Sequence, residues 1–192
     1  MVDIEGDLKK IKSDSTLSDT QKIKMFCDLM YERNVEPIIL RLSGYIKKKP
    51  MKVDYLLTFT PSRIILLRKS IIRKLADPGY VAGLGPHLYY VLSEKIDYSD
   101  IKGKDSFVQK TSLQSPDEIS IDYKDIKKFV LYPDAKTLVS NMFGTAIKEN
   151  VLLIHTVHEK FELILPTGKN GDYNKTFYWL KMCIPVKISK QL

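Results

Sequence analysis

The sequence contains few of the residue types that most catalytic and metal-binding sites use. Its 192 residues include two cysteines, three histidines and one tryptophan. Cys27 and Cys183 are too few and too far apart in the chain for a disulfide framework or a cysteine-ligated metal. We therefore expect both to be small core residues in a reducing, cytoplasmic compartment.

Catalytic motifs are also missing. The chain has no phosphate-binding Gly-rich loop, no Gly-x-Ser-x-Gly elbow and no Cys-x-x-Cys pair. His155 and His158 are three residues apart, but we expect them in a strand that runs into a turn, where such residues point to opposite faces. His87 is an isolated loop residue, and Asp122 and Asp125 have the pattern of surface residues around a strand end. We expect no enzyme, no bound metal and no cofactor.

Long apolar runs are absent as well. The longest uncharged run, residues 78–93, has 16 residues and contains two prolines, three glycines and a histidine, so it is not a membrane span. The first five residues, Met-Val-Asp-Ile-Glu, are acidic where the start of a signal peptide would be basic, and we expect none. With 44% hydrophobic and 28% charged residues, the chain has the composition of a folded domain.

What the chain has in excess is positive charge, and most of it lies in one segment. The whole chain carries 31 Lys and Arg against 23 Asp and Glu, a net charge of +8. Residues 41–74 contain ten basic residues and one acidic residue, a net charge of +9, so the rest of the chain sums to −1. The potentials of neighbouring charges add within a Debye length, and such a cluster attracts phosphate groups on lipids or nucleic acids. A solvated basic face that only keeps the protein soluble is the alternative.

The beginning of the chain has helical periodicity in two segments, with a break at residues 13–16. Ser18 followed by Gln21 is a capping box, which predicts the start of the second helix. We expect a helical hairpin over residues 1–36 that packs on, or extends from, a main domain over residues 37–192.

In the main domain, β-branched and aromatic residues at alternating positions indicate strands. The expected strands cover residues 38–46, 53–60, 64–67, 118–123, 129–132, 151–154 and 161–165. Residues 47–50 and Pro61-Ser62 have turn composition, so the basic segment falls on the first hairpin and at strand ends. If the first three strands form a meander, these basic residues are neighbours in space.

The segment 71–93 is apolar but rich in Gly and Pro, which excludes a regular strand or a long helix before Pro86. After Pro86, residues 87–93 have the composition of a short helix. A loop this apolar covers its own core, meets a partner or enters a lipid interface. Its candidate interface residues are Tyr80, Leu84, Leu88 and Tyr89.

The last expected element is an amphipathic helix that ends at Pro185. Its apolar stripe consists of Tyr173, Phe177, Leu180 and Ile184. A curved antiparallel sheet needs an element that covers its apolar core, and this helix can cover it. We therefore expect an α+β fold, with a bent antiparallel β-barrel capped by the C-terminal amphipathic helix and preceded by the helical hairpin.

Several local sequences resemble the pleckstrin-homology (PH)-like superfamily, in particular its bacterial and archaeal PH-like and GRAM-like branch. They are the strand-turn-strand LLTFTPSRIILL at residues 56–67, the apolar insertion after it, the strand ISIDYKDIKKF at residues 119–129, and FELIL at residues 161–165 before a helix with Trp179. The resemblance covers roughly residues 39–184, and its motifs contain no catalytic residues.

The resemblance implies a seven-stranded bent barrel capped by the C-terminal helix, which serves as a lipid-headgroup or protein-docking module. In lipid-binding PH domains the headgroup site lies on the first two strands and the loop between them. The matching basic residues are Lys47, Lys48, Lys49 and Lys52, followed by Arg63 and Arg68. Charged groups that converge on an open loop offer charge-assisted hydrogen bonds to a phosphate. Pro50 interrupts the loop and Asp54 stands where a Lys-x-Arg pattern is expected, so general anion attraction is implied rather than inositol-phosphate specificity.

The leading hypothesis is a non-enzymatic docking module that binds an anionic lipid headgroup or a protein partner through residues 47–52, helped by the apolar insertion. One alternative is a protein-interaction or oligomerisation domain, including a homo-oligomer. Another is nucleic-acid binding through residues 41–74, which is weaker because the aromatic residues there alternate as core residues do and no recognition motif occurs. We expect a cytoplasmic protein that can attach peripherally to a membrane.

Overall fold

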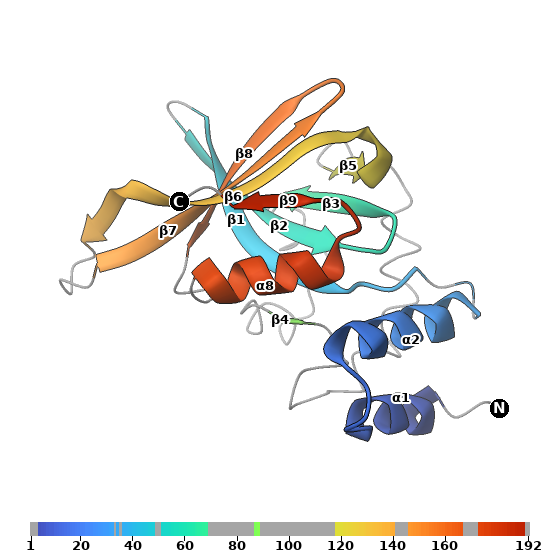
Figure 1. The fold of residues 1–192 in the computed structure, drawn as a ribbon. Helices are drawn as coiled ribbons and strands as arrows, with labels where there is room; N and C mark the ends of the chain where they lie inside the picture. The colour runs from blue at the N-terminus through green and yellow to red at the C-terminus, as the bar shows by residue number, and fades with distance from the viewer. Residues whose placement is uncertain are drawn as a thin grey trace.

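The computed structural model describes residues 4–32, 34, 36–48, 51–68, 87–88, 118–140, 146–166 and 173–190. Within these residues the chain has the expected α+β class, with α-helices packed on one large, mostly antiparallel sheet (Figure 1). The elements in chain order are α1 (Ile4–Ser13), α2 (Asp19–Tyr31), β1 (Leu40–Lys48), β2 (Met51–Phe59), β3 (Arg63–Arg68), β4 (His87–Leu88), β5 (Glu118–Asp122), the 3-10 turn η1 (Tyr123–Asp125), β6 (Ile126–Ser140), β7 (Ala146–Thr156), β8 (Lys160–Pro166), α8 (Tyr173–Cys183) and β9 (Ile188–Lys190).

The sheet contains two antiparallel meanders that meet at β1. In spatial order its strands are β5, β3, β2, β1, β8, β7, β6 and β9, and the short β4 pairs with β1 beside this path. β1 and β8 join the meanders at the pair Tyr45–Ile164, and β9 runs parallel to β6. β5 and β9 form the outer edges among the described strands, so the sheet is open where the sequence predicted a barrel.

The expected strands are present, but several have different boundaries. Lys47 and Lys52 pair in the β1–β2 ladder, so the first hairpin extends into residues that were expected to form a turn. β6 continues to Ser140, beyond the expected end at Tyr132, because β7 pairs with it along this length. The short, polar strand Ile188–Lys190 has no counterpart among the expected strands.

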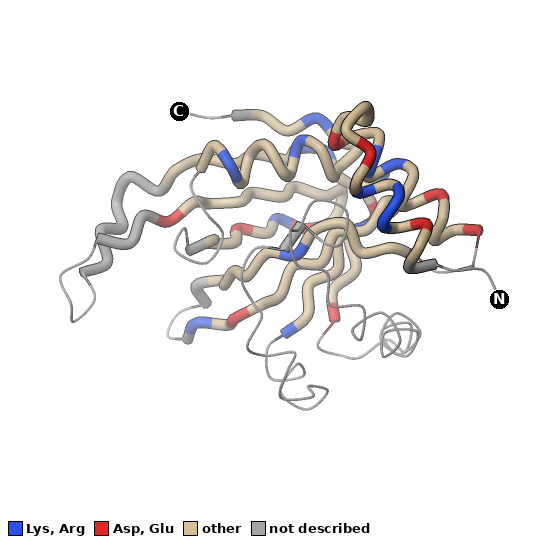
Figure 2. The backbone as a smooth tube through the Cα atoms, turned by 90° about the horizontal axis from the view of Figure 1, so that it is seen from below, with Lys and Arg blue, Asp and Glu red and all other residues tan. Residues whose placement is uncertain are grey.

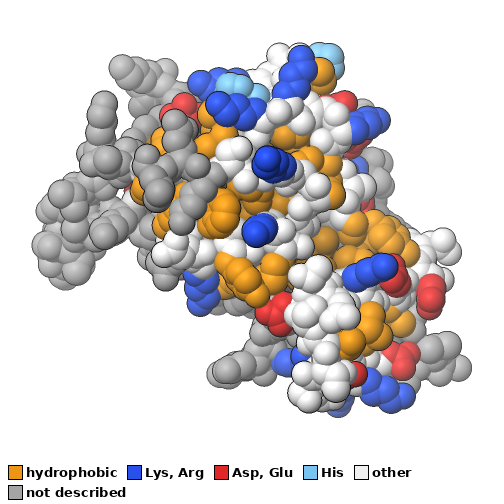
Figure 3. Space-filling model, in the orientation of Figure 1, with side chains coloured by type: hydrophobic (Ala, Val, Ile, Leu, Met, Phe, Trp, Pro, Cys, Tyr) orange, Lys and Arg blue, Asp and Glu red, His pale blue; other side chains and the backbone are white. Residues whose placement is uncertain are grey.

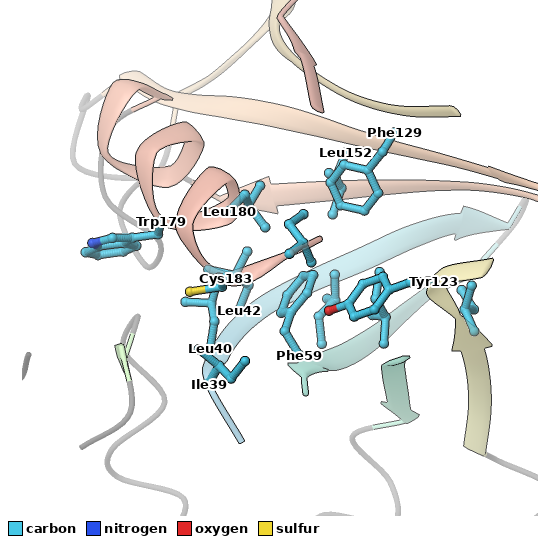
Figure 4. Packing of buried hydrophobic residues seen from close by; sticks show 14 of the residues in the cluster. Ile39, Leu40, Leu42, Phe59, Tyr123, Phe129, Leu152, Trp179, Leu180 and Cys183 are labelled. Carbon is cyan, nitrogen blue, oxygen red and sulfur yellow. The ribbon is translucent and has the colours of Figure 1, made fainter. Parts of the chain in front are cut away.

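One hydrophobic cluster fills the space between the sheet and the helices (Figure 4). Side chains alternate between the two faces of a strand, so every second residue of each central strand faces this cluster. Leu42, Phe59, Phe129 and Leu152, from four different strands, are among its largest fully buried side chains. The cluster therefore fixes which residues of each strand remain on the opposite face.

α8 lies along this cluster, and the face that it turns toward the cluster includes the predicted stripe but is wider. Leu180 and Ile184 are buried as expected, and Figure 4 shows Leu180 beneath the sheet. Tyr173 and Phe177 are only half-buried and stack on each other, with ring centroids 6.3 Å apart. Trp179, which the stripe omitted, is 8% exposed. Burial of Trp179 removes further apolar surface from water, so the buried face of α8 extends beyond the predicted stripe.

α1 and α2 form the expected helical hairpin. α2 begins at the predicted capping box, in which the Ser18 hydroxyl accepts from the Gln21 amide and the Gln21 side chain accepts from the Ser18 amide. Apolar residues of both helices, such as Phe26, belong to the same cluster as the sheet residues. α2 lies against α8, and the Tyr178 hydroxyl donates to Asp19 at the start of α2, 3.2 Å away. The hairpin therefore shares one core with the sheet.

Only His87 and Leu88 of the apolar insertion are among the described residues. They form β4, which pairs with Arg41 and Leu40 of β1, so the prediction of a helix from residue 87 is wrong at these two positions. The physical reason is the free edge of β1 before β8 begins, where backbone groups need partners. The other candidate interface residues, Tyr80, Leu84 and Tyr89, lie outside the described residues.

Candidate functional site

The end of the β1–β2 hairpin concentrates positive charge by strand register. Lys47 pairs directly with Lys52, and Lys48 pairs with Met51. These four residues are called the basic hairpin end here, and Lys49 of the predicted set lies outside the described residues. Directly paired residues on one face have Cβ atoms about 4.5–5.5 Å apart, and like charges at that distance destabilise a hairpin. An anion bound between them would remove this repulsion.

Lys52 rests on an aromatic platform. Its ammonium nitrogen is 3.6 Å from the centroid of the Tyr45 ring, whereas its side chain is otherwise exposed. The ring is fixed because Tyr45 is 5% exposed and its hydroxyl donates to Oε1 of Glu149 at 2.6 Å. An exposed cation–π contact contributes about 0.5–1 kcal/mol, enough to favour one orientation of the lysine without removing its charge. Tyr45 therefore presents the ammonium group of Lys52 to solvent.

Glu149 on β7 is the buried acid behind this platform. Its side chain is 5% exposed, and its second oxygen, Oε2, is shielded from solvent without a hydrogen-bond donor among the described residues. The only hydrogen bond that the structure shows for this carboxylate within the described chain comes from Tyr45. A buried carboxylate of this kind depends strongly on its single donor. Sequence reasoning missed Glu149, because a contact 104 residues away in the chain leaves no local signal.

Gly44 leaves room for the close approach of β8 to β1, because it has no side chain. A Cβ atom built on Gly44 would lie 2.9 Å from Cδ2 of Leu165 and 3.2 Å from the carbonyl oxygen of Ile164. Contacts below 3.0 Å are essentially never seen for real Cβ atoms, so a larger residue would force the buried Leu165 side chain to shift and would crowd the backbone of β8. The next residue is Tyr45, and the close approach at Gly44 therefore also places the platform of Lys52 against β7 and β8.

The other two arginines of the predicted anion-binding set lie elsewhere. Arg68 pairs with Tyr55, which is three residues from Lys52 on β2, so strand alternation puts the two basic side chains on opposite faces. Arg63 starts β3 beyond the other end of β2, and the seven residue steps from Lys52 to Phe59 alone span about 23 Å at strand rise. Of the six predicted residues, the β1–β2 register pairs Lys47 with Lys52 on one face of the hairpin, and Lys48, the next residue of β1, occupies a register position on the other face.

Arg63 instead forms an ion pair within the chain. Its Nη2 and Nε donate to Oε2 of Glu36 at 2.7 and 3.2 Å. The other oxygen of Glu36 accepts from the hydroxyls of Thr60 at 2.7 Å and Ser62 at 2.5 Å. Burial raises the pKa of Glu36, but the hydrogen bonds from Ser62, Arg63 and Thr60 outweigh it and leave the pKa below its usual value. This network, which we call the Glu36 clamp, ties the segment before β1 to the β2–β3 turn.

Tyr123 also holds this turn through hydrogen bonds. Its buried hydroxyl donates to the carbonyl oxygen of Thr60 at 2.9 Å, and its amide donates to the carbonyl of Ser62 at 3.2 Å. Burial strongly raises the pKa of this phenol, which therefore stays a neutral donor. Thr60 before the turn and Arg63 after it, two of the residues that carry the PH-like resemblance, thus have structural partners in Tyr123 and Glu36.

The cysteines have the predicted structural role. Cys27 and Cys183 are both buried, unbridged members of the hydrophobic cluster. Burial raises the pKa of Cys27 to about 11 and that of Cys183 to about 12, so neither forms the thiolate that nucleophilic or metal-binding chemistry needs.

The remaining candidates for chemistry are two histidines and two aspartates. His155 is in β7 and His158 is in the exposed turn that follows it, as predicted. Asp122 forms an ion pair with Lys124 at 3.3 Å, and the Asp125 carbonyl accepts from the Val157 amide. In the part of the chain that the structure describes, no three His, Cys, Asp or Glu side chains come together as a metal site.

Two further findings bear on the identity of the chain. Of the described helices, none combines the length and apolar character that a bilayer-spanning helix needs. A comparison with protein-family models, with curated proteins and with solved structures found nothing that matches the chain. A functional assignment therefore depends on the geometry of the chain's own residues.

Proposed function

We propose that this chain is a non-enzymatic docking module with a PH-like fold, which attaches peripherally to an anionic membrane surface through the basic hairpin end. The observation that carries the proposal is the β1–β2 register, which places Lys47 opposite Lys52 and seats Lys52 on Tyr45. Repulsion between the paired lysines destabilises the hairpin in the absence of an anion, and an anionic surface reduces that repulsion.

The strand order supports a PH-like fold. Apart from the short β4 and β9, seven strands precede α8, and they form two antiparallel meanders joined at β1 and β8. The resemblance implies seven strands followed by a C-terminal helix, and α8 packs on the core of the sheet. The two residues on either side of the β2–β3 turn that carry the resemblance, Thr60 and Arg63, fix that turn through the Glu36 clamp.

The size of the electrostatic attraction follows from the number of lysines. A lysine close to an anionic leaflet contributes about 1 kcal/mol, so Lys47 and Lys52 together give about 2 kcal/mol, or about thirtyfold in binding. The Debye length shrinks from about 10 Å at 0.1 M salt to about 3 Å at 1 M, so binding by this mechanism decreases steeply with salt. Attachment is therefore reversible and sensitive to ionic strength.

Liposome co-sedimentation tests the proposal. The protein is mixed at low salt with vesicles of phosphatidylcholine alone, or of phosphatidylcholine with phosphatidylserine. We expect sedimentation only with phosphatidylserine, and its loss in the double variant Lys47→Glu, Lys52→Glu. The matched control is Lys24→Glu, Lys181→Glu, which changes the net charge equally at exposed positions on α2 and α8 and should keep binding.

Two results would contradict the proposal. Equal sedimentation with both lipid mixtures at low salt would exclude an anionic surface as the ligand. Equal loss of binding in the hairpin variant and the helix variant would show that only net charge matters. In the first case, a protein partner becomes the ligand to test at the same hairpin.

A further inference from the structure

A second group of basic side chains lies on β6, β7 and β8, away from the basic hairpin end. His155 on β7 pairs with Lys128 on β6 and with Lys160 on β8. Directly paired residues of neighbouring antiparallel strands share a face, so the three side chains form one row across the sheet. Strands are about 4.8 Å apart, so the Cα atoms of the row lie within about 10 Å. We call Lys128, His155 and Lys160 the basic row.

The basic row lies on the face of the sheet opposite the core. The residues adjacent to it along the three strands, Phe129, Ile154 and Phe161, form the neighbouring row and are all buried in the hydrophobic cluster. Lys128 and Lys160 are exposed, and His155 is half-buried between them. Figure 3 shows histidine side chains bordered by lysine or arginine side chains at the top of the molecule, over the β7–β8 hairpin of Figure 1.

Hydrogen bonding in the basic row is incomplete. Nε2 of His155 is shielded from solvent and has no hydrogen-bond partner within the described chain. The structure shows no ion pair or hydrogen bond of the Lys128 or Lys160 side chain with any described residue. An unpartnered ring nitrogen between two ammonium groups is unfavourable, because both a hydrogen bond and a counter-charge are missing.

Nearby acids do not supply the missing charge. Glu162, two residues beyond Lys160 on the same face, is exposed and pairs with Leu153, and Glu159 lies in the exposed turn. Neither glutamate forms an ion pair with the row among the described residues. The positive charge of the row thus remains open to an external anion that has several acceptor oxygens.

We propose that the basic row binds a phosphate group that carries two negative charges, either inorganic phosphate or the terminal phosphate of a monoester. A dianionic phosphate can accept charge-assisted hydrogen bonds from both lysines at the same time, and it supplies the counter-charge that the row lacks. A monovalent diester phosphate has less charge for the same number of donors and binds more weakly. The site is separate from the basic hairpin end and does not depend on the function proposed for it.

The histidines of the chain make the site directly observable. Imidazole ring signals of the full-length, isotope-labelled protein are followed by NMR during a titration with inorganic phosphate, against sodium chloride at equal ionic strength. We expect the His155 signals to shift and to saturate, since its ring lies between the two lysines that bind the phosphate. His158, exposed in the turn three residues later, is the internal control and should change little.

Substitutions then test whether Lys128 and Lys160 bind the phosphate. Lys128→Gln and Lys160→Gln should each weaken phosphate binding about tenfold, the effect of one charge-assisted hydrogen bond. Lys127→Gln, the neighbouring exposed lysine, should leave the affinity within about twofold, because it changes the same charge outside the row. Lys128→Arg keeps the donor and should largely retain binding, and unchanged backbone amide spectra show that each variant is folded.

Two further probes distinguish the sources of the phosphate. Glycerol 3-phosphate presents a soluble monoester, and phosphatidylcholine vesicles with phosphatidic acid present the same group on a surface. Saturation by either probe at a lower concentration than inorganic phosphate supports the site and identifies its source. The variant Lys47→Glu, Lys52→Glu should leave the phosphate titration unchanged, so failure at the hairpin and failure at the basic row are separate results.

Linear, unsaturated shifts of equal size at His155 and His158 would overturn the proposal, since they would report only a general effect of the anion. A loss of affinity in Lys127→Gln as large as in Lys128→Gln would also overturn it.

Discussion

Replacing Glu36 with alanine removes the acceptor of four hydrogen bonds at the β2–β3 turn. A hydrogen bond to a charged group contributes about 1.5–3 kcal/mol, and removing the carboxylate leaves the Arg63 guanidinium without its acceptor. The Arg63 and Glu36 side chains are 29% and 18% exposed, so water replaces part of what is lost. We therefore expect Glu36→Ala to lower the free energy of unfolding by about 2–3 kcal/mol. Glu36→Gln, which keeps an acceptor for the hydroxyl groups, should cost about half as much.

Urea unfolding followed by the fluorescence of Trp179 measures this loss. Trp179 is the only tryptophan of the chain, is 8% exposed and belongs to the hydrophobic cluster, so its emission reports the loss of tertiary packing. The control is Asp28→Ala, which removes an equal charge from an exposed position on α2. Surface substitutions of this kind change stability by less than about 0.5 kcal/mol. A loss for Glu36→Ala no larger than for Asp28→Ala would refute the role of the clamp.

The same clamp makes stability depend on pH in one direction. The pKa of Glu36 is lower in the folded chain than in the unfolded one, so its contribution is fully present above the unfolded carboxyl pKa of about 4.3. It is lost as the pH falls from that value through the folded pKa, since the unfolded state then binds the proton first. The stability difference between the wild type and Glu36→Gln should therefore be constant near neutral pH and shrink below about pH 4. A difference that stays constant down to acid unfolding would contradict the assignment.

Three other predictions concern the positions behind the hairpin and in the core. Gly44→Val should destabilise the protein by about 1–3 kcal/mol in urea unfolding, because its Cβ has no room beside β8; an effect below 0.5 kcal/mol would contradict the close approach. Tyr45→Phe should cost about 1–3 kcal/mol because it leaves Glu149 buried without its donor, and the combination with Glu149→Leu should recover part of that loss. Cys27 and Cys183, with raised pKa values, should react with a colorimetric thiol reagent only as fast as the protein unfolds; a fast reaction in the native protein would disagree with their burial.

Local patterns in the sequence predicted the elements of the fold well. The capping box at Ser18, the apolar alternation in the strands and the periodicity of α8 each depend on residues within a few positions of one another. Chain-local chemistry determines such features, and the sequence shows it directly. The burial of Trp179 beside the predicted stripe of α8 was missed, because it depends on the neighbouring elements and not on the helix alone.

The candidate sites depend on contacts that no local pattern contains. Lys47 and Lys52 could be placed together because a two-stranded hairpin fixes their register. The basic row needs three strands in register, with Lys128 and His155 at pairing positions that a bulge between Ile126 and Lys128 shifts by one residue. That shift moves a lysine from one face to the other, and it cannot be inferred from alternation in β6 alone.

The net positive charge counted along residues 41–74 overstates the positive charge that is accessible to a ligand. Of the arginines in the +9 segment, Arg41 is 4% exposed and Arg63 is neutralised by Glu36, whereas the basic hairpin end keeps its lysines at a strand end. Figure 2 shows the described Lys and Arg positions on the helices as well as on the strands, which agrees with this dispersion. The basic row gains its positive charge from residues outside the +9 segment, through pairing of strands that are distant in the chain. Register and burial, more than the local density of lysine and arginine, therefore decide where this protein presents positive charge to an anion.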